Sequence, residues 1–121
     1  MSGTLIGGIT GAATSGLSMA TGAVKVVGSA QKRGTILHKA ASNLEAGNMA
    51  LNPVKYSKIT LNRSLNTAGL SGRRVPDVIG IARNGSSKLI EVVSKSQTVR
   101  QMTAKCISMV NANPGASYKV V

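Results

Sequence analysis

Two of the chain's three carboxylates lie in one stretch, "RRVPDVIGIARNGSSKLIEVVSKSQT", residues 73–98. Asp77 and Glu91 each border a short run rich in Val and Ile, a composition that favours buried strands. Asn84-Gly85 stands between the two runs and is a signal for a tight hairpin turn. Because the two strands of a hairpin are neighbours, the side chains of Asp77 and Glu91 can converge at one end of a sheet.

Two buried carboxylates repel each other unless a cation neutralises them. Oxygen ligands suit Mg²⁺, which commonly takes one or two carboxylates and completes its shell with water and phosphate oxygens. A metal ion of this kind supports phosphodiester hydrolysis by polarising the phosphate and by activating water. The pair therefore predicts Asp77 and Glu91 as metal ligands, although salt bridges to Arg73, Arg74 or a nearby lysine would explain two isolated acids as well.

The overall charge indicates the kind of partner. Fifteen Lys and Arg against three acidic residues give a formal net charge of +12. Such a field attracts polyanions, with nucleic acid as the first candidate, whereas a simpler interpretation is that the charge only keeps a small protein soluble. Both DNA and tRNA fit, because phosphate contacts carry no sequence information. Five residues are expected to hold the phosphate backbone: Arg73, Arg74, Arg83, Lys88 and Arg100.

His38 suggests a second chemistry. His38 and Glu45 are seven residues apart and would share one face of a helix, two turns from each other. An imidazole and a carboxylate can act as general acid and base in RNA cleavage without a metal ion, where the 2′-hydroxyl attacks its own phosphate. A lone histidine is, however, more often a structural residue.

Other cofactors are not expected. One cysteine and one histidine cannot supply the four ligands of a zinc site. Cys106 falls on a helical stripe with Val99, Met102 and Met109, which predicts a buried, unreactive thiol. The sequence has no glycine-rich phosphate loop, and we therefore expect neither zinc nor an organic cofactor.

The pattern along the chain predicts one α/β (α+β) domain at residues 35–121. A helix is expected at 35–51, with Thr35 as N-cap and Leu37, Ala41, Leu44 and Leu51 as its apolar stripe. A second helix is expected at 98–113. The strands are expected at 54–65, 75–83, 88–94 and 117–121. The order is α-β-β-β-α-β, with the helices packed on a small mixed central sheet.

Residues 1–34 form a separate, Gly/Ala-rich leader in this interpretation. Residues 5–24 carry no charge, but ten of these twenty are Gly, Ser or Thr, so the segment is not apolar enough for a spanning helix. We expect a flexible or loosely helical segment without stable membrane insertion. Disruption of membranes by this leader is a weaker alternative.

The element order, Pro76-Asp77 and Glu91 resemble the PD-(D/E)XK, or restriction-endonuclease-like, nuclease fold. The stretch 73–98 looks like that of nuclease toxin domains at the C-termini of bacterial polymorphic toxins of the Rhs and contact-dependent growth inhibition types. The resemblance covers residues 35–121 by element order and 73–98 by motif. It implies that Asp77 and Glu91 bind Mg²⁺, that Glu45 is the acid of the first helix, and that Gln97 is the polar residue after the motif.

The chain departs from this family at the motif lysine. The position two residues after Glu91 is Val93, and the next lysine on the same strand face, Lys95, lies roughly 13 Å from Glu91 by strand rise. A bulge would let Lys95 take over the role of the missing lysine and stabilise developing charge. The substitution also supports a different class of protein, a basic nucleic-acid-binding module without catalysis.

The resemblance implies a biological setting as well. It implies an antibacterial toxin nuclease, delivered from the producing bacterium as part of a larger effector and active on tRNA or DNA in the target-cell cytoplasm. An immunity protein would neutralise it, and we expect that protein to be acidic because opposite charge speeds association. Elongation factor Tu is a further expected partner if the substrate is tRNA.

Overall fold

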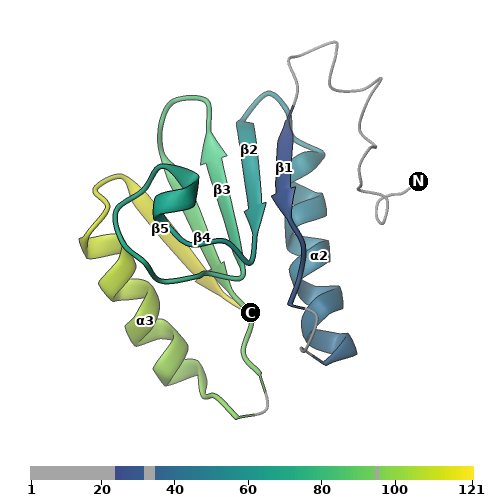
Figure 1. Ribbon diagram of the computed structural model, residues 1–121, viewed down its shortest axis with the longest axis vertical. Helices are drawn as coiled ribbons and strands as arrows, with labels where there is room; N and C mark the ends of the chain where they lie inside the picture. Colours follow the sequence, from purple (N-terminus) through teal and green to yellow (C-terminus); the bar gives the residue numbers. More distant parts are fainter. Residues whose placement is uncertain (1–23, 32–34, 95) are drawn as a thin grey trace.

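The computed structural model describes residues 24–31, 35–94 and 96–121. Its strands form one five-stranded sheet whose spatial order follows the sequence (Figure 1). The strands are β1 (Lys25–Gly28), β2 (Tyr56–Leu61), β3 (Val78–Ala82), β4 (Ser87–Glu91) and β5 (Ala116–Val120). The helices are α2 (Ile36–Ala50), α3 (Val99–Asn111) and the short 3-10 helix η1 (Asn66–Ala68).

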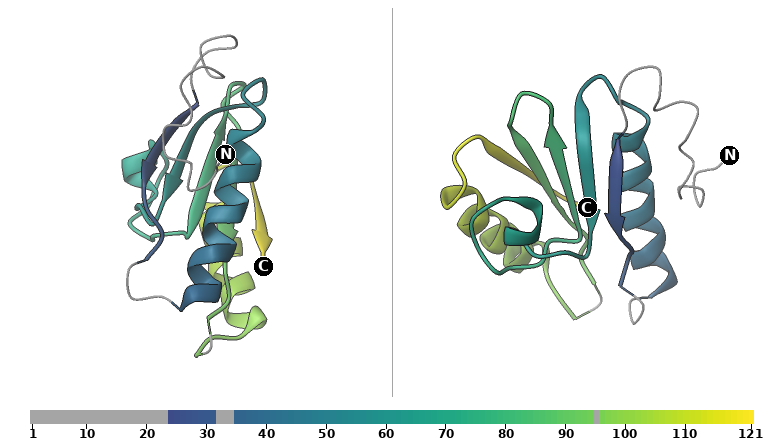
Figure 2. Two further views of the ribbon diagram at one scale, coloured as in Figure 1. Left: turned by 90° about the vertical axis from the view of Figure 1, so that its right-hand side faces the viewer. Right: turned by 45° about the horizontal axis from the view of Figure 1, so that its top comes forward.

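The sheet is mixed. β1 runs parallel to β2 and β4 runs parallel to β5, whereas β3 is antiparallel to both of its neighbours. α2 packs against β2 and β3, and α3 packs against β4 and β5 (Figures 1 and 2). The predicted order α-β-β-β-α-β is found from α2 onward, and the predicted mixed sheet with packed helices is confirmed.

β1 is a strand that was not expected from the sequence. Residues 25–28 belong to the segment interpreted as a leader, yet Val26 lies opposite Ile59 of β2 in the sheet. Two adjacent β-branched residues, Val26 and Val27, suit a strand, and the pairing satisfies the free edge of β2. The sheet thus begins before residue 35, and residues 1–23 and 32–34 lie outside the described residues.

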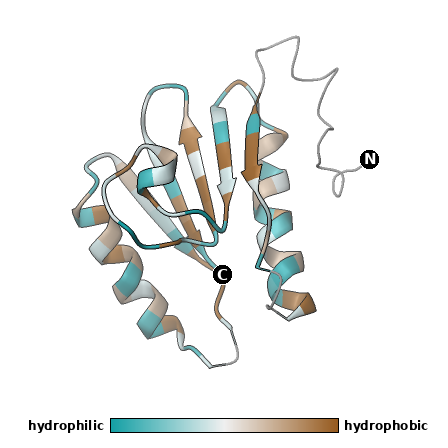
Figure 3. Cartoon of the chain, in the orientation of Figure 1, coloured by the Kyte–Doolittle hydropathy of each residue, from teal (hydrophilic) through white to brown (hydrophobic). Residues whose placement is uncertain are grey.

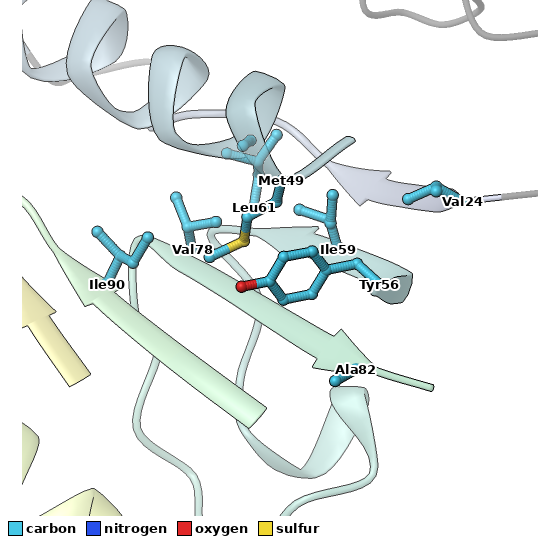
Figure 4. Packing of buried hydrophobic residues seen from close by; sticks show 9 residues of the cluster. Val24, Met49, Tyr56, Ile59, Leu61, Val78, Ala82 and Ile90 are labelled. Carbon is cyan, nitrogen blue, oxygen red and sulfur yellow. The ribbon is translucent and has the colours of Figure 1, made fainter. Parts of the chain in front are cut away.

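The core has one cluster on each face of the sheet. On one face, Met49 of α2 packs on Val78 and Ile90 (Figure 4). On the other face, α3 and the loop around η1 pack on Ile79 and Leu89. Successive residues of a strand point to opposite faces, so the two helices cover opposite faces of one sheet. The strands accordingly carry most of the strongly hydrophobic colour in Figure 3.

The structure contradicts the stripe predicted for the first helix. Thr35 does cap α2, because its Oγ1 accepts a hydrogen bond from the backbone N–H of His38 at 3.1 Å. Leu37, however, is 82% exposed and Leu44 is 63% exposed. The buried residues are instead His38, Ser42, Ala46 and Met49. On this buried face of α2, the ring of His38 meets the carboxylate of Asp77.

α3 follows its prediction more closely. Thr98 and Gln101 form a capping box at its start, and Met102, Cys106 and Met109 are buried. Val99, predicted on the same stripe, is 62% exposed. Val99 is the first residue of the helix, and the contacts of the helix with the core begin at Met102.

The hairpin between β3 and β4 sets the register of the site. Gly85 has φ +92°, which glycine adopts without strain, and Asn84 Oδ1 accepts the N–H of Ser86 at 2.9 Å. The register pairs Val78 with Ile90. One step further along the ladder, Asp77 lies opposite Glu91, as the sequence predicted.

Replacing Gly80 is expected to destabilise the fold. A Cβ on this residue of β3 would lie 2.6 Å from Met49 Sδ and 3.0 Å from Tyr56 Cε1. Gly80→Ala should therefore lower the free energy of unfolding by about 1–3 kcal/mol, measured by urea denaturation. Unchanged stability would show that Met49 moves aside without cost.

Candidate functional site

Asp77 is the residue immediately before β3, and its side chain joins three elements. It is buried, and its Oδ2 accepts a hydrogen bond from the backbone N–H of Val92 at 2.7 Å. The same oxygen lies 3.4 Å from His38 Nε2 of α2. Because Val92 directly follows β4, Asp77 connects the start of one strand, the end of the next and the first helix.

Glu91, the last residue of β4, is the most deeply buried acid of the three, with 2% exposure. Lys105 Nζ of α3 forms a close ion pair with its Oε2 at 2.7 Å. Burial raises the pKa of Glu91 from 4.5 to about 7, the ammonium of Lys105 opposes this shift, and the charge of Asp77 adds to it. The carboxyl can therefore gain or lose a proton near neutral pH.

His38 reaches the site from the side opposite to α3. Its ring is buried, and among the described residues its Nδ1 has no hydrogen-bond partner. Nε2 faces Asp77, so the two ring nitrogens have different surroundings. Two carboxylates, an imidazole and an ammonium from four elements thus meet at one end of the sheet, which we call the ionisable cluster: His38, Asp77, Glu91 and Lys105.

Some of the predicted site residues lie elsewhere. Glu45, predicted as the acid of the first helix, forms an ion pair with Lys119 at 3.1 Å and lies roughly 10 Å along α2 from His38 by helical rise. Gln97 Oε1 accepts hydrogen bonds from the backbone and the hydroxyl of Ser94, so its amide shapes the turn before α3. Lys95 lies outside the described residues.

Lys105 is the member of the cluster that was not predicted from the sequence. It lies three residues after Met102 and four before Met109, inside the buried stripe of α3. A lysine at an apolar position of a helix is rarely buried without a charged partner. The position of Lys105 between two buried methionines was the signal in the sequence that could have found it, because such a lysine indicates a carboxylate partner in the core.

The predicted phosphate-binding residues form two groups. Arg73 and Arg74 are exposed in the loop that leads to Asp77, and Arg100 is exposed in the first turn of α3. Arg83 and Lys88 lie near the hairpin turn, at the other end of β3 and β4. Arg83 Nε donates a hydrogen bond to the carbonyl of Pro53 at 2.7 Å. Among the described residues, neither Arg73 nor Arg74 pairs with Asp77, whereas Glu91 does form a salt bridge with a lysine, Lys105. The salt-bridge alternative is therefore found for Glu91 and not for Asp77.

A cavity of about 470 Å³ lies against His38, on the α2 side of the cluster. His38 and Val92, both in contact with Asp77, contribute to its wall. The wall is mostly apolar, and Val93 forms part of it in place of the motif lysine. The lining residues are Thr35, Ile36, Leu37, His38, Ala41, Val92, Val93, Ser94 and Val121.

Asp77 and Glu91 are the carboxylates of the cluster, and carboxylate oxygen is a ligand type that could hold a metal ion there. Within 24–31, 35–94 and 96–121, His, Cys, Asp and Glu do not form a group of three or more that could hold a metal ion. Asp77 and Glu91 nevertheless supply two carboxylates, which is the number that Mg²⁺ often takes from a protein.

Cys106 is fully buried, and burial together with the charge of Glu91 raises the pKa of its thiol to about 11. Its burial was predicted, and the thiol stays protonated near neutral pH.

Lys105→Met is expected to raise the pKa of Glu91 above about 7, because the favourable ion pair with the carboxylate is lost. The chain has two glutamates, so carbon-13 labelling of Glu gives one signal for Glu91 and one for Glu45. An NMR titration of both carboxyls measures the effect. Lys119→Met, which removes the partner of Glu45, is the matched control. An unshifted Glu91 in Lys105→Met would contradict the ion pair.

In the part of the chain that the structure describes, no helix combines the length and the apolar character needed to cross a membrane. Comparisons of the chain with known protein families, with curated proteins and with solved structures give no match.

Proposed function

We propose that the protein is a nuclease that cleaves phosphodiester bonds at the ionisable cluster. The observation that carries this proposal is the meeting of four ionisable side chains from four elements, three of them buried, in a chain of net charge +12. Acidic and basic side chains are rarely buried unless they are paired, and a carboxyl with a raised pKa is typical of catalytic sites. The positive charge supplies the attraction for a polyanionic substrate.

The arrangement of elements supports a restriction-endonuclease-like fold as part of this proposal. The order from α2 to β5 is the one that the resemblance implies, with an aspartate at the start of β3 and a glutamate at the end of β4. Lys105 supplies an ammonium beside Glu91 at a site where Val93 replaces the motif lysine. A lysine from α3 can therefore serve in place of a lysine on the strand.

Each residue of the cluster has a separate role in the proposed reaction. Asp77 and Glu91 would hold Mg²⁺, and the ion supplies the Lewis acidity that polarises the phosphate. Lys105 balances the negative charge of Glu91 and that of the approaching phosphate. Asp77 orients the ring of His38 through Nε2 and leaves Nδ1 to accept or donate a proton.

His38 also supports a second candidate, cleavage of RNA without a metal ion. The observation that favours it is the 3.4 Å approach of Nε2 to Asp77 beside a cavity that His38 itself lines. The carboxylate of Asp77 would hold the imidazole in place, so that the ring can take the proton of a 2′-hydroxyl.

The resemblance extends the proposal to a biological setting. We propose an antibacterial toxin domain that acts on tRNA or DNA in the target cell and is neutralised by an acidic immunity protein. The net charge of +12 supports an acidic partner. Elongation factor Tu remains a proposed co-partner for a tRNA substrate.

The experiment that tests the proposal is gel-based cleavage of total tRNA and of supercoiled plasmid by the purified chain, in Mg²⁺ and in EDTA. Mg²⁺-dependent cutting that His38→Ala retains in part would support the metal nuclease. EDTA-resistant cutting of tRNA that His38→Ala abolishes would support the metal-free reaction. Absence of cutting in both buffers, with and without cell extract, would leave a non-catalytic binding module.

A further inference from the structure

A second cavity lies at the C-terminal end of α2, away from the ionisable cluster. Its volume is about 220 Å³, and residues of α2, β4, β5 and the segment before β2 line it. Unlike the apolar cavity beside His38, it gathers charged and amide side chains. Six polar residues contribute to it: Glu45, Asn48, Asn52, Lys55, Lys88 and Lys119.

The charge in this cavity is not balanced. Lys119 is the one lysine of the three that pairs with a carboxylate, because Glu45 contacts it through both oxygens at 3.1 and 3.2 Å. Within the described chain, Lys55 and Lys88 form no ion pair, and Lys55 Nζ lies 5.2 Å from the centre of the Tyr56 ring. Three ammonium groups against one carboxylate leave an excess of two positive charges.

The asparagine amides add hydrogen-bonding groups to the cavity, so its selectivity for a ligand depends on more than charge. Asn48 and Asn52 also line the cavity, and the side-chain amide of each has an NH₂ group that can donate hydrogen bonds. Ammonium and amide donors that converge on a small concave space suit an anion with several acceptor oxygens. A phosphate group has that chemistry, whereas a cation or an apolar side chain does not.

The position of the cavity relates it to the cluster. Lys88 precedes Glu91 by three residues on β4, roughly 10 Å by strand rise. Asn48 follows His38 by ten residues on α2, roughly 15 Å by helical rise. The two sites therefore share a helix and a strand but occupy opposite ends of them, a separation that a short nucleic-acid segment can span.

We propose that this cavity binds a backbone phosphate of the nucleic acid, several bonds away from the phosphate that is cut. This inference rests on the proposed function, because it takes the nuclease substrate as the ligand. Lys55 and Lys88 supply the attraction, and Asn48 and Asn52 orient the phosphate oxygens. Lys119 is held by Glu45 at the rim.

Binding without cleavage tests the proposal. The probe is a fluorescein-labelled single-stranded RNA of about twelve nucleotides, within the usual range of single-strand binding sites, and binding is measured by anisotropy in EDTA at several salt concentrations. Lys55→Met/Lys88→Met is compared with Lys25→Met/Arg63→Met. Both doubles remove two charges, and Lys25 and Arg63 are exposed outside the cavity.

The expected result is that the cavity double binds about tenfold more weakly than the control double. Its slope of log affinity against log salt should be smaller by about 0.7, since one lost single-strand phosphate contact contributes about that much. Equal weakening of both doubles, with equal slopes, would overturn the proposal and leave only general electrostatic attraction.

A second arm separates backbone phosphate from free phosphate. Inorganic phosphate and the RNA are titrated in turn while the side-chain amide signals of Asn48 and Asn52 are followed by nitrogen-15 NMR. Shifts with RNA at lower concentration than with inorganic phosphate support the proposal, and shifts with inorganic phosphate alone overturn it. Because no arm requires cleavage, a chain that binds RNA here and never cuts would refute the nuclease and retain this site.

Discussion

Glu91→Gln is expected to abolish cleavage while raising the melting temperature of the protein above neutral pH. Glutamine cannot donate a carboxylate to a metal ion or exchange a proton with substrate, so the cleavage rate should fall by about 10² to 10⁴-fold. The same change removes the need to bury a negative charge, because Glu91 is 2% exposed. Activity and stability should therefore move in opposite directions.

The pH dependence of this effect follows from the raised pKa. Glu91 has a pKa of about 7 in the folded protein against 4.5 for the ordinary side chain, so the folded state holds the extra proton between these values. The unfolded state binds fewer protons there, and the contribution of Glu91 to stability falls as pH rises from about 4.5 through about 7. Below about 4.5 both states are protonated and this loss is absent.

Melting temperatures of wild type and Glu91→Gln in EDTA, near pH 5 and near pH 8, measure the prediction. The advantage of the glutamine variant should be larger at the higher pH. Glu45→Gln removes one carboxylate outside the cluster and serves as the control for net charge. An advantage of the same size at both pH values would contradict a buried titrating Glu91.

Two substitutions of Asp77 are expected to differ in their effect on stability but not in their effect on cleavage. Asp77→Ala leaves the buried N–H of Val92 and the Nε2 side of His38 without their acceptor. It should lower the free energy of unfolding by about 1–3 kcal/mol. In Asp77→Asn the amide oxygen can keep the hydrogen bond to Val92, so its stability should stay nearer to wild type.

Both Asp77 variants should nevertheless lose cleavage to a similar extent, because neither presents a carboxylate to a metal ion or to His38. Urea denaturation gives the stabilities, and plasmid and tRNA gels give the activities. Retained cleavage in Asp77→Asn would show that Asp77 is structural. An asparagine variant as unstable as the alanine variant would contradict the role assigned to its Oδ2.

Local signals in the sequence determined both long helices, the β3–β4 hairpin and the pairing of Asp77 with Glu91 in the cluster. Threonines 35 and 98 cap the two helices by hydrogen bonds within one turn, and Asn84-Gly85 forms the hairpin by its own backbone preference. The hairpin also brings Asp77 opposite Glu91, because a short turn fixes the register of its strands. Contacts over few residues suffice for these features.

Only the tertiary structure decided which helix faces complete the cluster. The hydrophobic period of α2 favoured Leu37 and Leu44, yet the sheet buries His38, because Asp77 offers it a partner across a long sequence separation. Lys105, whose side chain is 22% exposed, extends to the buried Glu91 for the same reason, since the two charges attract each other. Glu45, two turns from His38, finds Lys119 instead. The helical period shows which residues share a face of the helix. The charged residues on the facing strands decide which of these faces is buried against the sheet.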